Sequence, residues 1–289
     1  MRALLTGFLV GAAVVAVLAL GAWSLVERRA AAALDRRFDI PLETVRVPAD
    51  SASMAEGERL GWLVGCHSCH GDSLEGKVFV DEPKVLRLVA PNVIDVARGY
   101  TDAELERLVR HGVRRDGRGV VAMPAATTYH LSDADVGRLI ASLRAAPLVR
   151  RELPATELRA FGTMAAALGR IVPDAATIDH LGARLGDRGD TTRTARGEYL
   201  VRITCAECHG ATLMGSATSP ALVKAYGYSS AEFVSLLLDG RARDGRDLGL
   251  MRRTSQARFI RFTRDEIEAI YAWLQVMPVR PAAASAAAR

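Results

Sequence analysis

Two stretches of the chain place apolar residues three and four positions apart, the spacing of a helix that packs one face against a core. The first stretch begins after Ser132, and its apolar positions are Val136, Leu139, Ile140 and Leu143. The second begins with the capping box of Thr263 and Glu266, and its apolar positions are Ile267, Ile270, Tyr271 and Leu274. Shorter helices are predicted at 51–66, 102–111, 194–205 and 230–238.

The N-terminal pattern is different, because residues 3–26 include no charged side chain. At about 1.5 Å per residue, a helix of this length crosses the hydrocarbon core of a bilayer, which is about 30 Å thick. The stretch is longer than the apolar region of a typical cleaved signal peptide, and the alternative cleavage site at 19–21 is a poor one. We therefore expect a transmembrane helix at 1–28 that stays attached as a membrane anchor.

Strand signals are sparse, so the predicted fold class is mainly α. Residues 78–80 and 85–88 flank a turn sequence that contains Pro83, which predicts a β-hairpin within 77–90. Residues 148–192 contain Pro154, Pro173 and one apolar stretch near 161–171, a composition typical of a connector. Residues 278–289 are mostly alanine, and we expect a disordered tail there.

The length and charge of the chain limit its class. At 289 residues it suits two domains of about a hundred residues each, which we place at 51–147 and 193–277. Lysine and arginine exceed aspartate and glutamate by 38 to 33, a net charge of +5. Because this surplus is small and dispersed, nucleic acid is not an expected partner.

The two predicted domains repeat one another. The sequence GYTDAEL at 99–105 recurs as GYSSAEF at 227–233, and DGR at 116–118 recurs at 244–246 with the same offset. The copies differ mainly by the predicted hairpin, which stands where the second copy has only residues 216–219. This insertion is either a loop elaboration or part of a partner surface. Because the two halves repeat one another, each half is expected to be one domain with equivalent functional positions.

The candidate chemistry lies in two Cys-x-x-Cys-His motifs, at 66–70 and 205–209, which use all four cysteines. Two intervening residues on a helical turn bring both sulfurs to one side, and the histidine follows directly. This spacing is the attachment signature of c-type haem, in which the thiols bond to the haem and the histidine ligates the iron. Zinc binding and thiol redox chemistry are the alternatives. The residues so predicted are Cys66, Cys69, His70, Cys205, Cys208 and His209.

A sixth iron ligand has to come from farther along the chain, which must pass around the haem to its other face. Met123 and Met251 occupy the same position of the repeat, and this favours them as ligands over a role as core filler. Met123 is followed by Pro124, whereas Met251 is followed by two arginines. His111 and His130 bracket the Met123 loop and are the rival ligands.

Both halves resemble class I cytochrome c domains, and the whole chain resembles a membrane-anchored dihaem c-type cytochrome. The resemblance covers about 51–146 and 193–277 and implies two covalently attached haem c groups, each with its iron. It also implies that the backbone carbonyls of Pro91 and Pro220 accept the N–H of the proximal histidines. The family's usual Met-Pro pair is kept at Met123 and lost at Met251.

The resemblance implies one-electron transfer in a respiratory chain, from a dehydrogenase to an oxidase or a soluble cytochrome. An iron bound by both histidine and methionine has no vacant coordination position, so we expect an electron-transfer protein rather than an enzyme. It would serve alone or as the cytochrome subunit of a dehydrogenase complex. A dihaem peroxidase-type enzyme and a haem-based redox or gas sensor are the alternatives, and both require an iron that opens.

The orientation in the membrane rests on haem chemistry. Four arginines, at 28, 29, 36 and 37, follow the apolar stretch, and the positive-inside rule would place the domains in the cytoplasm. Attachment of c-type haem is expected outside the cytoplasmic membrane and outweighs this signal. We therefore expect a single-pass protein of the cytoplasmic (inner) membrane with its haem domains in the periplasm.

Overall fold

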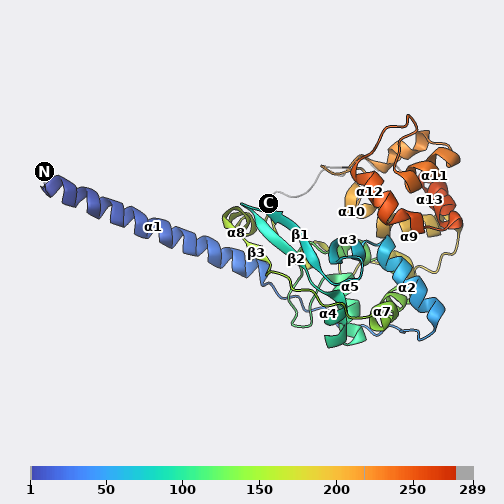
Figure 1. Cartoon of the computed structure of the whole chain (residues 1–289), viewed down its shortest axis with the longest axis horizontal. Helices are drawn as coiled ribbons and strands as arrows, with labels where there is room; N and C mark the ends of the chain where they lie inside the picture. The colour runs from blue at the N-terminus through green and yellow to red at the C-terminus, as the bar shows by residue number, and fades with distance from the viewer. Residues whose placement is uncertain (1, 218, 278–289) are drawn as a thin grey trace.

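A computed structural model describes residues 2–217 and 219–277 as a long N-terminal helix and a mainly helical body (Figure 1). The long helix is α1 (Arg2–Leu34), which projects from the body. Among the described helices, it alone is long and apolar enough to cross a membrane, judged by length and composition, with a mean hydropathy of 2.4. The predicted tail at 278–289 lies outside the described residues.

The first half of the body holds helices on both sides of the first cysteine motif. The prediction for 102–111 is confirmed residue for residue, and those at 51–66 and after Ser132 are confirmed to within a few residues. The short α4 and α6 were not predicted, because they are too brief to show a periodic pattern. The helices are α2 (Ser51–Leu63), α3 (Cys66–His70), α4 (Val93–Gly99), α5 (Asp102–His111), α6 (Ala125–Thr128) and α7 (Asp133–Ala145).

The second half repeats this order of helices. Both α5 and its counterpart α11 begin with a capping box and end at a glycine in the left-handed region, Gly112 and Gly240. The capping box of Thr263 and Glu266 is also confirmed. The elements are α9 (Arg193–Thr204), α10 (Ala206–His209), η3 (Leu222–Gly227), α11 (Ser230–Asp239), α12 (Leu250–Ala257), η4 (Phe259–Arg261) and α13 (Arg264–Val276).

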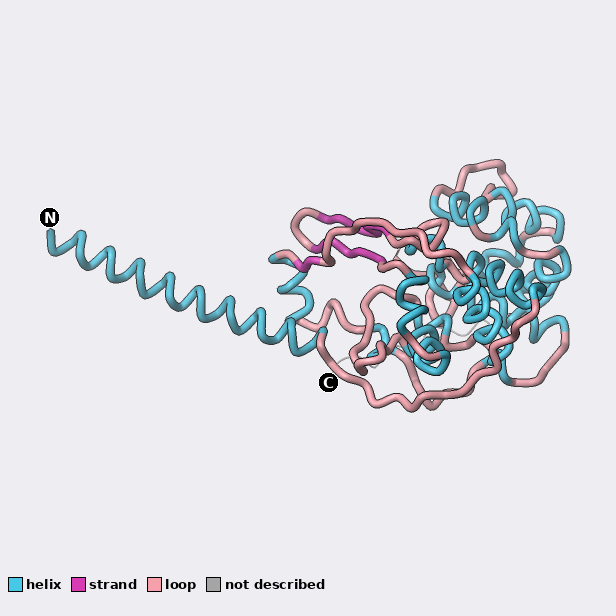
Figure 2. Tube along the Cα trace, turned by 60° about the horizontal axis from the view of Figure 1, so that its bottom comes forward, coloured by secondary structure: helices cyan, strands magenta, loops and turns pink. Residues whose placement is uncertain are grey.

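The predicted hairpin is confirmed as β1 (Lys77–Glu82) and β2 (Leu86–Ala90), which pair antiparallel. The connector adds β3 (Glu157–Leu158) to the free edge of β2, and a two-residue strand leaves no alternating pattern to predict. It then forms α8 (Ala160–Ala167), which packs against α1. Figure 2 shows the strands together at the end of the body from which α1 projects. Farther on come η1 (Asp174–Thr177) and η2 (Leu185–Asp187).

A close helix crossing defines each half. Helix α2 packs on α7, and α9 packs on α13 in the same way. At the crossing points stand Gly57 and Gly197, where an added Cβ would lie 1.9 Å from the carbonyl oxygen of Arg138 and 2.0 Å from that of Ala269. The absence of a side chain therefore lets the two backbones touch at equivalent positions of the repeat.

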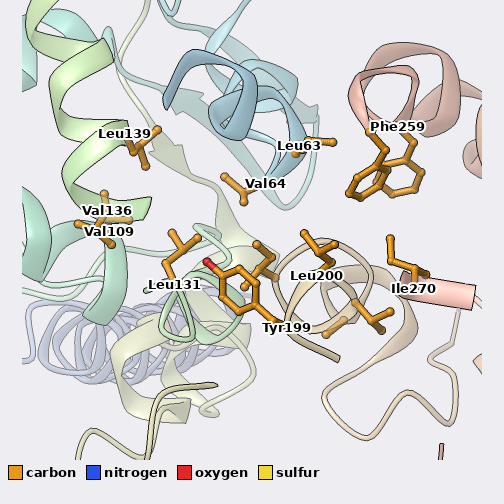
Figure 3. Packing of buried hydrophobic residues seen from close by; sticks show 14 of the residues in the cluster. Leu63, Val64, Val109, Leu131, Val136, Leu139, Tyr199, Leu200, Phe259 and Ile270 are labelled. Atoms are coloured by element: carbon orange, nitrogen blue, oxygen red, sulfur yellow. The ribbon is translucent and has the colours of Figure 1, made fainter. Parts of the chain in front are cut away.

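One apolar core runs through both halves without a break. Its fully buried members include Leu63 and Leu131 of the first half and Leu200 of the second. Figure 3 shows side chains of both halves meeting in this core, among them Leu63, Leu131, Tyr199 and Phe259. The Tyr199 hydroxyl donates to Asp135 at 2.5 Å and accepts from the Ser132 amide at 3.2 Å, so a buried polar contact joins α9 to the start of α7. The halves are thus packed against each other.

We expect Gly57→Ala to lower the free energy of unfolding by about 2 kcal/mol, because even one methyl group must push α2 away from α7. The matched control is Gly99→Ala, where an added Cβ meets nothing within 4 Å. Denaturant unfolding followed by circular dichroism measures both. Equal stability of the two variants would show that the α2–α7 crossing does not depend on the glycine.

Candidate haem-binding sites

Each cysteine motif forms a single short helical turn that special backbone conformations hold in place. In the first motif, α3 starts after Gly65 and ends before Gly71, both with φ near 90°. Leu74, a few residues on, has φ 58°, and its counterpart Leu213 has φ 62°. Such positive φ values are uncommon for residues other than glycine, and their recurrence shows that both loops follow the same path around the motif.

Both motif histidines are oriented by a proline carbonyl. The His70 Nδ1 lies 2.8 Å from the Pro91 oxygen, and the His209 Nδ1 lies 2.7 Å from the Pro220 oxygen. A carbonyl only accepts, so Nδ1 carries the proton in each ring and Nε2 keeps its lone pair. A histidine held in this way is ready to bind a metal through Nε2, and these are the hydrogen bonds that the resemblance implied.

A cavity of about 420 Å³ lies beside the first motif. Its lining includes Cys69 from the motif and Met123, so an expected attachment residue and an expected ligand share one space. The wall is mainly apolar and includes Ala122 and Pro124. The donor set of thiol, imidazole and thioether, together with this cavity, fits a covalently bound haem.

The Met123 loop is held by a residue of the connector. The Met123 amide donates to the Asp174 carboxylate at 2.9 Å, and Asp174 also lines the cavity. Burial raises the pKa of Asp174 to about 6, although the hydrogen bond from Met123 acts in the opposite direction. No local pattern predicts this contact, because fifty-one positions separate the two residues.

Met251 has a different local setting from Met123. It lies in the first turn of α12, its amide donates to Leu248, and its side chain packs against the core. Met123 instead precedes Pro124, which caps the very short α6. The Arg252 side chain that follows Met251 pairs with Asp247 at 2.6 Å. The roles of both methionines as iron ligands stay predictions.

The structure separates the two rival histidines. His130 lines the cavity beside Met123, and its buried Nδ1 finds no hydrogen-bond partner in the described part of the chain. His111 is engaged elsewhere, with its Nδ1 2.8 Å from the Nδ1 of His180. His67, inside the first motif, is buried and stacks on Trp62 with ring centroids 4.0 Å apart. Of the two rivals, only His130 lies at the expected haem cavity.

The cysteines are not activated thiols. All four are free of disulfides, and burial raises the pKa of Cys66 to about 11. Burial likewise raises the pKa of Cys69, Cys205 and Cys208. A thiol that remains protonated is a poor redox nucleophile, so the thiol redox chemistry considered as an alternative is disfavoured.

A buried arginine joins the two motifs. Arg258, in the second half, donates from Nε and Nη2 at 3.0 and 2.7 Å to the carbonyl of Leu63, the last residue of α2, shortly before the first motif. Its Nη1 donates at 3.0 Å to Glu207, which lies between the cysteines of the second motif. Arg258 was not predicted, but the repeat offers a signal, since His130 occupies the same repeat position and also faces the other half.

Further ion pairs close the contact between the halves. Arg59 pairs with Glu266 at 2.8 Å and donates to the carbonyl of Arg261 at 2.8 Å. The Arg261 guanidinium lies 3.9 Å from the centre of the Trp62 ring. Because these groups come from α2 on one side and from η4 and α13 on the other, they fix the first motif relative to the second.

Comparison with known protein families identifies both halves. Residues 52–141 match the family described as cytochrome c oxidase, cbb3-type, subunit III, and residues 194–278 match the cytochrome c family. Two cytochrome c domains imply two covalently bound haem c groups, with the two Cys-x-x-Cys-His motifs as the attachment sites.

Similar proteins include cytochrome subunits of dehydrogenases. The chain is 35% identical over 102 residues to the cytochrome c subunit of the quinone alcohol dehydrogenases of Gluconacetobacter polyoxogenes and Komagataeibacter europaeus. It is 33% identical over 140 residues to a subunit of the nicotinate dehydrogenase of Pseudomonas putida. These matches cover 32% and 45% of the chain and only 22% and 12% of the relatives' lengths.

We expect Arg258→Met to destabilise the contact between the halves by about 2 kcal/mol, because the Leu63 carbonyl and Glu207 lose their charged donor. The midpoint of thermal unfolding should fall by roughly 5 °C. Arg193→Met is the control, since Arg193 forms an exposed pair with Glu268, and such pairs contribute less than about 1 kcal/mol. A midpoint that both substitutions lower equally would contradict the role of Arg258.

Proposed function

We propose that this chain, which carries two cytochrome c domains in tandem, relays electrons one at a time from a dehydrogenase to an oxidase or a soluble cytochrome in a respiratory chain. The electron-transfer class follows from the two domains. The dehydrogenase as donor is supported by the relatives, which are named as dehydrogenase subunits. The chain itself would transform no substrate.

The chain's own residues would hold each haem and close its iron. Bound haem supplies the redox chemistry, one electron for each iron. On one side, His70 and His209 offer Nε2, because the proline carbonyls occupy Nδ1. On the other side, Met123 and Met251 would offer a thioether, which raises the reduction potential relative to a second imidazole. With both positions filled, small molecules have no access to the iron.

The main observation that supports the proposed relay is the cavity that both motifs line. Cys69 of the first motif and Ala206 and Glu207 of the second motif line the same space beside Met123. Arg258 ties the same two motifs together through Leu63 and Glu207. The attachment sites therefore face one another inside a single packed body, which suits passage of an electron between the domains without release to a partner.

The membrane end of the chain supports anchoring beside a membrane-bound donor. The apolar part of α1 would cross the cytoplasmic membrane once, with the haem domains in the periplasm. Where α1 meets the body, α8 packs on it, and Phe161 of α8 and Leu168 just after it are 63% and 69% accessible. Apolar side chains exposed beside an anchor are suited to the bilayer surface.

We expect Met123→Ala to open the first haem, so that the reduced variant binds about one carbon monoxide per chain while both haems stay attached. The matched control is Met164→Ala on the exposed face of α8, which should bind none. Visible spectroscopy of the reduced proteins measures both. If the Met123 variant stays closed, methionine is not the ligand and His130, in the same cavity, takes its place.

We expect replacement of residues 1–28 by a cleavable export signal to release a soluble protein that still carries both haems, because α1 alone would provide the anchor. Haem staining of membrane and soluble fractions measures this outcome. Retention of the truncated protein on membranes would contradict a single anchor. In that case, a variant with Phe161→Ser and Leu168→Ser shows whether these exposed apolar side chains cause the retention on membranes.

A further inference from the structure

A group of metal-ligand side chains lies outside the two haem sites. One ligand atom from each of Glu43, Glu106 and His111 lies within 4.8 Å of the other two. Glu106 and His111 come from α5 of the first domain, and Glu43 comes from the segment between α1 and α2. The fold therefore brings together residues that are more than sixty positions apart in the chain.

The hydrogen bonds around His111 leave its Nε2 with a free lone pair. His180 Nε2 lies 2.9 Å from the carbonyl oxygen of Ala175, so this nitrogen must donate, and in the neutral ring the His180 Nδ1 is then an acceptor. The His111 Nδ1, 2.8 Å away, must donate to it. A histidine whose Nδ1–H is held by a neighbour and whose Nε2 is bare has the arrangement of a metal ligand.

Two buried acceptor atoms of the group are unsatisfied. His111 and Glu106 are 2% and 0% exposed, and neither His111 Nε2 nor Glu106 Oε2 has a hydrogen-bond partner among the described residues. Two acceptors cannot satisfy each other without a proton or a cation between them. Leaving both unpaired in a buried site is costly, and a cation would satisfy both at once.

The net charge around the group is negative enough for a divalent cation. Two guanidiniums, Arg110 and Arg184, face it, and together they contact four carboxylates: Glu43, Glu106, Asp133 and Asp187. The carboxylates exceed the guanidiniums by two. The Arg110 and Arg184 contacts use Glu106 Oε1 and Glu43 Oε2, so each glutamate keeps its second oxygen for an ion.

The site has a route for entry. The Glu43 side chain is 42% exposed, and it lines an open cavity of about 510 Å³ together with His180 and Arg184. An ion arriving from solvent would meet Glu43 first and reach the two buried ligands behind it. One position would remain for water, which gives the three-protein-ligand pattern of open zinc sites.

We propose that Glu43, Glu106 and His111 bind one divalent transition-metal ion of the zinc class. One imidazole nitrogen with two carboxylate oxygens suits such an ion better than calcium or magnesium, which prefer all-oxygen sites. The ion would link α5 to the segment between α1 and α2. The His111–His180 hydrogen bond would extend this link to the connector. The ion would thus stabilise the first domain independently of the haem bound there.

The test uses the full chain with both haems attached, stripped with a chelator and titrated with Zn²⁺. In this form the cysteines are in thioether bonds and His70 and His209 are bound to iron, so few other strong zinc ligands remain. Elemental analysis should give one zinc for every two irons. X-ray absorption at the zinc edge, which the haem iron does not obscure, should show nitrogen and oxygen ligands including an imidazole and no sulfur.

Glu43→Gln should weaken zinc binding at least about tenfold, because it removes a charged ligand while the amide keeps the shape of the half-exposed side chain and an oxygen for Arg184. The matched control is Glu152→Gln, at a residue of the connector outside the group, which should bind zinc as the natural chain does. His111→Gln should abolish zinc binding. If the His111→Gln variant fails to fold, the Glu43→Gln variant decides the matter. Absence of bound zinc, sulfur ligation, or equal affinity in Glu43→Gln and the control would overturn the proposal.

Discussion

A buried guanidinium fixes the position of one haem-attachment motif relative to the other. Arg258 reaches from the second domain to the last carbonyl of α2 and, in the opposite direction, to Glu207 inside the second motif. Burying a charge is unfavourable unless it is paired and hydrogen-bonded, so the arginine holds its partners at one separation rather than a range of them. The continuous apolar core and the Arg59–Glu266 pair act on the same contact. The cavity shared by Cys69 and Glu207 lies between the two halves that this contact joins.

The connector does more than join two domains. It supplies β3 to the hairpin, packs α8 against α1, and brings Asp174 to the Met123 amide and His180 to His111. The first domain therefore depends on residues that follow it in sequence, whereas the second has no comparable additions among its described residues. This asymmetry matches the hairpin insertion, which gives the first domain an edge strand that needs covering.

Sequence alone predicted those parts of the molecule that depend on local signals. The shared offset of the repeat and the helical patterns at 102–111 and 230–238 located α5 and α11, the capping box of Thr263 and Glu266 located the start of α13, and the cysteine spacing located both motifs. Asp174 and Glu43 could not be found in this way, because each acts through a contact between distant segments and has an ordinary local sequence, and Arg258 has only its shared repeat position with His130 as a signal. At Met251 the repeat is a poor guide to local structure. Met251 occupies the same repeat position as Met123, but it lies in a helix, whereas Met123 precedes one.

The proposed electron relay depends on a closed pair of irons in one packed body. A redox titration of the purified protein by visible spectroscopy, repeated on the reduced form with carbon monoxide, tests it most directly. We predict two low-spin haems whose reduced spectra carbon monoxide leaves unchanged, because the proposed histidine and methionine ligands would leave neither iron a vacant position. A high-spin haem, or one that binds carbon monoxide in the natural chain, would contradict the closed relay and favour an enzyme or a sensor.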